Sequence, residues 1–310
     1  MAADPQVQAL LAMFAGLPAP DYATLSALDY RAGLAQMQLP PLNEAVARVA
    51  EYTLPGPTGP LAARLYHPQP QQRVPAIVFF HGGGWVSCGI ATHDNLCRRL
   101  ANLSGCAVIS VDYRLAPEAV FPAALDDACA ALRWVHLQAQ LLGIDAERMA
   151  VAGDSAGGNL AAACAQLARE PSHELPKLSH QLLFYPVLDA ACDTPSYDTY
   201  AEGYLLTGDL MRWFWNQYVP SAQDRLDPRA SPARTEDLAG LPGATIISAQ
   251  CDPLHDEGSD YAARLRQAGV PVTLQCWDGL FHGFASMAGI LPAADEAIAA
   301  GAAAVRRALG

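Results

Sequence analysis

A short serine motif bounded by glycines constrains this chain more than any other feature. Residues Gly153–Gly157 read G-D-S-A-G and stand between an apolar run, Met149–Ala152, and an alanine-rich run, Gly158–Ala163. The first run is typical of a buried strand and the second of a helix. A serine between them sits on a sharp turn, and glycines avoid crowding there. The motif predicts a strand that feeds directly into a helix, with Ser155 standing clear of the sheet as a candidate nucleophile.

A second glycine cluster lies upstream. Residues His81–Trp85 read H-G-G-G-W and follow an apolar, strand-like run, Ala76–Phe80. Three consecutive glycines disfavour folding because glycine loses the most backbone entropy, so a purely structural loop is the less favoured interpretation. The favoured one is an oxyanion hole, whose backbone N–H groups approach a substrate oxygen only if no Cβ intervenes. Ala156, directly after the candidate nucleophile, is expected to supply a further N–H group.

An aspartate and a histidine downstream complete the pattern. Asp252 follows a strand-like run, Ala244–Cys251, and carboxylates at the carboxyl ends of strands lie at the ligand-binding edge of open α/β sheets. His282 follows a second such run, Val272–Trp277, and a predicted turn at residues 278–279. Alone, this histidine would more often be a packed core residue. The chain order serine, aspartate, histidine nevertheless matches a known order of catalytic triads.

Asp154 is an alternative acid because it adjoins the serine. A residue next to the nucleophile on a tight turn does not easily reach behind the histidine ring, so we prefer Asp252.

Five segments together resemble one known family, and they are His81–Trp85, Asp112–Glu118, Gly153–Gly158, Asp252–Leu254 and His282–Phe284. The chain is similar, over about residues 45 to 310, to the hormone-sensitive-lipase-like bacterial carboxylesterases of the α/β-hydrolase superfamily. This resemblance implies a serine esterase without a cofactor. It further implies that Ser155 is the nucleophile, His282 the base and Asp252 the residue that orients it. The implied oxyanion donors are Gly83, Gly84 and Ala156.

The remaining pattern predicts the architecture. Strand-like and helical runs alternate after a predicted hairpin at residues 49–66, which favours a mostly parallel eight-stranded sheet flanked by helices. We expect an α/β-hydrolase core formed by residues 45–186 and 231–310.

The resemblance also implies a helical cap, which we expect residues 1–44 and 187–230 to form. Apolar spacing predicts helices over residues 4–17 and 24–37, and the second segment is too long for a structureless loop. A brace on the core remains the alternative for the N-terminal helices. For the aromatic-rich run Met211–Tyr218, core packing and lining of the acyl pocket are both open. The candidate substrate-binding residues are Trp85, Asp154, Leu205, Leu206 and Phe214.

Composition limits the kinds of partner that we expect the protein to bind. A formal charge of −12, from 19 basic and 31 acidic residues, opposes nonspecific binding to nucleic acid or anionic membranes. We find neither a secretory-type N-terminus nor an apolar run of about 20 residues, which predicts a cytoplasmic protein without a membrane segment. The eight cysteines form no C-x-x-C pattern, so we expect small buried hydrophobes and not metal ligands. An edge strand at Val272–Trp277 could pair two copies as a homodimer.

The sequence therefore predicts a carboxylesterase that hydrolyses short- to medium-chain acyl esters of small molecules through an acyl-enzyme. An amidase or carbamate hydrolase with the same triad is the alternative. A noncatalytic ligand-binding receptor on the same fold is disfavoured because His282 is present.

Overall fold

The computed structural model describes residues 5–15, 20–36 and 44–310, and its centre is one eight-stranded sheet. The strands are β1 (Arg48–Pro55), β2 (Pro60–His67), β3 (Val74–Phe80), β4 (Ala107–Val111), β5 (Ile144–Asp154), β6 (His180–Phe184), β7 (Gly243–Cys251) and β8 (Val272–Phe281). Their order is β1-β2-β4-β3-β5-β6-β7-β8. Strand β2 runs antiparallel to β1 and β4, and every other neighbouring pair is parallel. The predicted mostly parallel eight-stranded sheet is confirmed.

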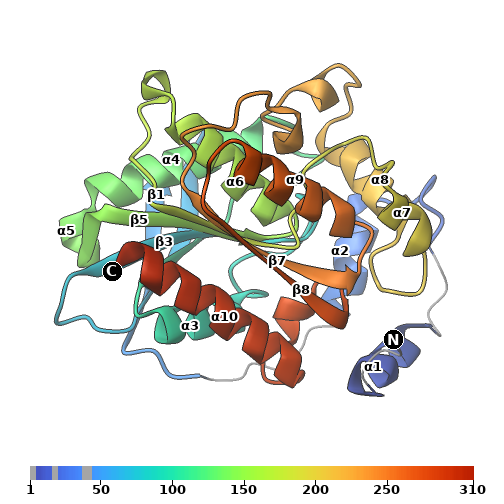
Figure 1. Ribbon diagram of the computed structural model, residues 1–310, viewed down its shortest axis with the longest axis horizontal. Coiled ribbons are helices and arrows are strands. Elements are labelled where there is room, and N and C mark those ends of the chain that lie inside the picture. The colour runs from blue at the N-terminus through green and yellow to red at the C-terminus, as the bar shows by residue number, and fades with distance from the viewer. Residues whose placement is uncertain (1–4, 16–19, 37–43) are drawn as a thin grey trace.

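Helices cover both faces of the sheet. Helices α3 (Asp94–Ser104) and α10 (Pro292–Leu309) pack on one face, while α4 (Ala123–Leu137), α6 (Ala156–Ala168) and α9 (His255–Gln267) lie across the other (Figure 1). A short helix, α5 (Ala139–Leu142), follows α4. Alternate residues of β3 enter the two apolar clusters, Val78 and Phe80 in one and Ile77 and Phe79 in the other. Burial on both faces explains why the parallel strands are continuously apolar.

The segment between β6 and β7 carries its own helices, α7 (Pro195–Thr199) and α8 (Gly208–Tyr218). Helix α8 begins after Thr207, whose side-chain oxygen accepts the N–H of Leu210 at 3.0 Å. This cap satisfies one of the N–H groups that a helix leaves free at its start. The aromatic-rich run Met211–Tyr218 is therefore helical.

The N-terminal segment forms α1 (Pro5–Ala15) and α2 (Ala27–Gln36). Residues 4, 16, 17 and 37, at the predicted helix boundaries, lie outside the described residues. Helix α2 begins three residues later than predicted because Ser26 caps it, its hydroxyl oxygen accepting the N–H of Asp29 at 3.1 Å.

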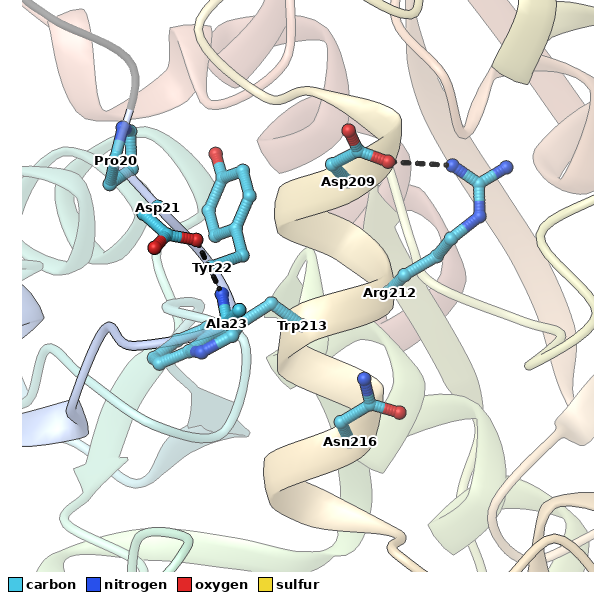
Figure 2. Close-up of a pocket in the computed structure, with 8 residues that line it drawn as sticks. All are labelled: Pro20, Asp21, Tyr22, Ala23, Asp209, Arg212, Trp213 and Asn216. Carbon is cyan, nitrogen blue, oxygen red and sulfur yellow. Dashed lines mark hydrogen bonds and ion pairs between the residues drawn. The ribbon is translucent and has the colours of Figure 1, made fainter.

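Helix α2 and the turn before it pack on α8, far along the chain. The Tyr30 ring lies 5.3 Å from that of Trp213 and 5.4 Å from that of Phe214. In Figure 2 the side chain of Trp213 projects from α8 toward the segment that carries Tyr22 and Ala23. These two segments line a surface pocket of about 490 Å³ that does not include Ser155. The two parts predicted to form a cap are thus in contact with each other.

Strand β8 differs from its predicted form. The turn predicted at residues 278–279 is wrong, because β8 continues through it to Phe281. Gly279 adopts a φ of 69°, and its N–H donates to the Gln250 side chain at 2.8 Å, where β7 and β8 shift register. A local irregularity within a continuous strand explains the glycine.

Strand β8 is also an edge of the sheet. Pairing of two copies there stays a prediction, which sedimentation at several concentrations tests. None of the helices within the described ranges is both long and apolar enough to cross a membrane.

A buried carboxyl group joins the core to the segment with α7 and α8. Glu257, on α9, accepts the N–H groups of Leu188 and Asp189 at 2.6 and 3.0 Å and lies 2.9 Å from the hydroxyl of Tyr197. Burial raises the pKa of Glu257 to about 8. The folded protein therefore holds this proton at pH values where the unfolded chain has released it.

We expect the contribution of Glu257 to the free energy of unfolding to fall as the pH rises from about 4.5 to about 8. Each proton that the folded state alone retains contributes a slope of at most about 1.4 kcal/mol per pH unit. Glu257→Gln keeps an acceptor for the two N–H groups and does not titrate. The difference in free energy of unfolding between the original chain and this variant should therefore fall as the pH rises from 5 to 9. Urea unfolding at pH 5, 7 and 9 measures both slopes, and equal slopes would contradict the assignment.

Candidate active site

Ser155 occupies a strained turn between β5 and α6. Its φ and ψ are 54° and −118°, a region that non-glycine residues rarely adopt. Such a conformation costs on the order of 1–3 kcal/mol and persists only where the surrounding structure enforces it. The predicted strand–turn–helix is therefore present, with the serine at its apex.

Two glycines make this turn possible. A Cβ at Gly157 would overlap the backbone carbonyl of Phe80, and one at Gly153 would overlap the backbone of Gly157. Phe80 ends β3, so α6 starts in direct contact with the neighbouring strand. Because only backbone atoms meet there, no side-chain rearrangement can make room.

The serine, histidine and aspartate form one chain of hydrogen bonds. His282 Nε2 lies 2.8 Å from Ser155 Oγ, and His282 Nδ1 lies 2.8 Å from Asp252 Oδ2. The second carboxylate oxygen of Asp252 accepts the N–H of Leu254 at 2.9 Å. Asp252 is fully buried, whereas the Ser155 residue keeps 8% of its surface exposed. The structure thus brings together three residues from the ends of β5, β7 and β8.

The glycine loop (residues 81–88) follows β3 beside this serine. His81 Nδ1 lies 2.7 Å from the carbonyl oxygen of Gly82, which can only accept, so Nδ1 carries the proton. Burial lowers the pKa of His81 to about 3, which keeps the ring neutral. Its ring stacks on Tyr113 at 4.3 Å, and the Tyr113 hydroxyl donates to the His81 carbonyl.

These contacts set the direction of the backbone N–H groups. A trans peptide places the C=O of one residue opposite to the N–H of the next. The His81 ring holds the Gly82 carbonyl and thereby orients the N–H of Gly83. Likewise, the Gly83 carbonyl accepts the N–H groups of Val86 and Ser87 at 3.1 and 3.0 Å, which orients the N–H of Gly84.

The predicted oxyanion donors are available. Within the part of the chain that the structure describes, the N–H groups of Gly83, Gly84 and Ala156 donate to no other protein group. Ala156 is the first residue of α6, where a helix leaves its N–H groups unpaired and partially positive.

Asp154 faces the glycine loop. Its Oδ1 accepts the N–H of Gly82 at 2.9 Å and lies 3.1 Å from His93 Nε2, with both side chains buried. Burial alone would lower the pKa of His93, but the Asp154 carboxylate outweighs it and raises that pKa. These contacts support a role in holding the loop; substrate binding by Asp154 stays a prediction.

The other predicted substrate-binding residues differ in their surroundings. The Trp85 ring is fully buried, stacked on Tyr218 at 4.4 Å, so its contacts favour a structural role. Phe214 lies against the loop, because a Cβ on Gly84 would overlap its ring. The two leucines differ in exposure, Leu206 being buried and Leu205 half-buried with a φ of 64°.

Sequence reasoning missed Tyr185. Its ring centroid lies 4.7 Å from that of His282, and its hydroxyl accepts the N–H of Ala285 at 3.2 Å. Tyr185 follows β6, at the sheet edge where the site residues gather, and that position was the available signal. No cluster of three or more His, Cys, Asp or Glu side chains suited to a metal ion occurs among the described residues.

Comparison with known proteins defines the class. The profile of the alpha/beta hydrolase fold family matches residues 77–286. An ethyl acetate hydrolase of Pseudomonas putida is 46% identical over 77% of this chain and 76% of that protein. The carboxylesterase NlhH of Mycobacterium tuberculosis is 42% identical over 90% of this chain and 88% of its own length. Among solved structures, a hyperthermophilic esterase from the archaeon Pyrobaculum calidifontis has a TM-score of 0.91 and 41% identity, covering 99% of both chains.

The chain therefore belongs to the alpha/beta hydrolase fold family, in its hormone-sensitive-lipase-like branch. Within that class it is a carboxylic ester hydrolase. The family, fold and enzyme class inferred from the sequence motifs are confirmed.

Gly157→Ala should lower the free energy of unfolding by about 3 kcal/mol, because the added methyl group meets the backbone of β3. Gly33→Ala is the matched control, since Gly33 also lies in a helix and has open space around it. It should be neutral or stabilise by up to about 1 kcal/mol. Urea unfolding followed by tryptophan fluorescence compares them, and equal stabilities would refute the close contact.

Proposed function

We propose that this ester hydrolase uses Ser155, His282 and Asp252 as its catalytic triad. The observation that carries the proposal is the unbroken hydrogen-bond chain from the buried Asp252 carboxylate through both ring nitrogens of His282 to the Ser155 hydroxyl. Because the carboxylate accepts the Nδ1 proton, Nε2 is free to take the serine proton. The three groups therefore stand in the roles of orienter, base and nucleophile.

The proposed reaction is a two-step acyl transfer. Ser155 Oγ attacks the ester carbonyl while His282 removes its proton, and the N–H groups of Gly83, Gly84 and Ala156 stabilise the oxyanion. The tetrahedral intermediate collapses, and His282 protonates the departing alcohol. Water, activated by the same histidine, then hydrolyses the acyl-enzyme and releases the acid.

The proposed substrates are small-molecule esters with short to medium acyl chains. The Phe214 ring fills the space directly over Gly84, which favours a limited pocket beside the oxyanion donors. Leu206 and half-buried Leu205 are proposed as further pocket residues. The name of the Pseudomonas putida relative, ethyl acetate hydrolase, describes a short ester and supports this size class.

We also propose that residues 1–44 and 187–230 act as a cap over a core of residues 45–186 and 231–310. The contacts of Tyr30 with Trp213 and Phe214 support one joint cap.

Hydrolysis of amides or carbamates has a test of its own. An amidase or carbamate hydrolase would use the same triad, and anilides assayed beside matched esters distinguish it. A noncatalytic receptor on this fold is inconsistent with the enzyme class, and His282 is hydrogen-bonded to both of its proposed triad partners.

On p-nitrophenyl esters with two to sixteen acyl carbons, we expect a maximum of kcat/KM at short or medium chains. Ser155→Ala removes the nucleophile and should lower kcat by at least about 10⁴-fold without unfolding the protein. Ser248→Ala, which changes another buried serine, is the control. Substantial turnover by Ser155→Ala would exclude the proposed nucleophile.

Phe214→Leu should shift the preferred acyl length upward by two or more carbons, because a smaller side chain opens space over Gly84. Trp213→Leu changes the neighbouring aromatic residue of α8 and should leave the preference in place. The ratio of kcat/KM for octanoate to acetate esters measures the effect. An unchanged ratio in Phe214→Leu would remove this residue from the acyl pocket.

A further inference from the structure

Helix α2 reaches the glycine loop through two consecutive residues. The Tyr30 ring packs edge-on against Phe214 at 5.4 Å, and Phe214 covers Gly84. Arg31 extends from the same helix to the backbone of the loop itself. The N-terminal segment is therefore in contact with the proposed oxyanion hole as well as with α8.

Arg31 binds one carbonyl oxygen of the glycine loop and one of a neighbouring segment. Its Nε donates to the carbonyl of Val86 at 2.6 Å, and its Nη2 donates to the carbonyl of Ala116 at 2.8 Å. The N–H of Ala116 donates in turn to the carbonyl of Trp85 at 2.9 Å. The planar guanidinium thus ties the end of the loop to a neighbouring segment at a fixed spacing.

A carboxylate fixes the orientation of this guanidinium. Glu118 accepts from Nη1 and Nη2 of Arg31, both at 2.7 Å. The Glu118 side chain is 65% exposed, so the ion pair itself contributes little to stability. Its two-point geometry nevertheless directs the remaining donors of Arg31 toward the two carbonyl groups.

The Val86 carbonyl is one peptide group away from the contact that orients Gly84. The N–H of Val86 donates to the Gly83 carbonyl, and that carbonyl shares a peptide plane with the N–H of Gly84. The N–H of Ser87 shares a peptide plane with the Val86 carbonyl and also donates to the Gly83 carbonyl, at 3.0 Å, so Arg31 orients this second donor. Release of the Val86 carbonyl would weaken these two backbone contacts and leave the Ser87 hydroxyl, at 2.9 Å, as the remaining donor to the Gly83 carbonyl.

We propose that Arg31 is a positioning residue for the oxyanion hole, acting through the carbonyl of Val86 to hold the N–H of Gly84 in its productive direction. The inference rests on the proposed function of Gly83 and Gly84 as oxyanion donors. Full stabilisation of the transition state would then require α2, which carries Arg31, to be packed in place. Arg31 touches no reacting atom in this proposal.

The chain offers a closely matched control in Arg169. Its Nη1 donates to the carbonyls of Asp237 and Ala239 at 2.8 and 3.0 Å, and its Nε pairs with Glu170 at 3.3 Å. Its side chain is 24% exposed, compared with 27% for Arg31. Arg169 follows the last turn of α6, at the opposite end of that helix from Ser155.

The test compares Arg31→Ala, Arg31→Lys and Arg169→Ala in the full chain on p-nitrophenyl butyrate. A trifluoromethyl ketone, which adds to the serine as a charged tetrahedral adduct, serves as the transition-state probe. We expect Arg31→Ala to lower kcat by about tenfold or more, below the 10²–10³-fold loss typical of deleting one donor outright. KM should change by less than about threefold, and the ketone should bind more weakly by a factor close to the loss in kcat/KM.

Arg31→Lys reaches one carbonyl but does not bridge two, so its kcat and ketone affinity should lie between those of the original chain and of Arg31→Ala. This variant also tests the inference if Arg31→Ala does not fold. Arg169→Ala should keep kcat and ketone affinity. An unchanged kcat in both Arg31 variants, or an equal loss in Arg169→Ala, would overturn the inference, as would a loss confined to KM. Ser155→Ala in the same assay separates the two proposals. If it retains turnover, the proposed function fails, and if it is inactive while Arg31→Ala is fully active, only the present inference fails.

Discussion

The close approach of two backbones, at Gly157 and Phe80, determines how the candidate site is arranged. Strands β3 and β5 are parallel neighbours with Phe80 opposite Gly153, so both chains leave the sheet at the same edge. One continues into the glycine loop and the other turns at Ser155. The serine and the loop are adjacent because the two strands are hydrogen-bonded, and a side chain at Gly157 would force them apart. The pairing of β3 with β5 therefore places the serine beside the loop, and the absence of a side chain at Gly157 lets the two backbones approach.

Around that contact, buried polar groups hold the loop in a conformation that apolar packing alone would not select. His81, Asp154 and His93 bond to the backbone or to each other beneath the loop. Each has a specific partner, which offsets the cost of removing a polar group from water. The strained φ of Ser155 is maintained in the same way, by rigid neighbours rather than by its own preference. Stability elsewhere in the core supports a locally unfavourable geometry at the site.

The sequence predicts the parts of the site that local patterns encode. Ser155 stands in a glycine motif, and Asp252 follows an apolar strand, so both positions were expected from neighbouring residues. The contacts of Arg31 with Val86 and of His93 with Asp154 have no local pattern, because each joins residues 55 or more positions apart. Trp85 illustrates a second limit of prediction from sequence. Nothing in the sequence indicates that its ring packs in the core against Tyr218. Side-chain direction at a loop depends on the tertiary packing that surrounds it.

The contact between the N-terminal segment and α8 has a consequence for biosynthesis. Tyr22 and Thr207, which lie 3.3 Å apart, are separated by 185 positions, and His282 follows 75 positions later still. During translation α2 leaves the ribosome well before α8, the helix on which it packs. The nascent chain therefore lacks the proposed triad until His282 has left the ribosome.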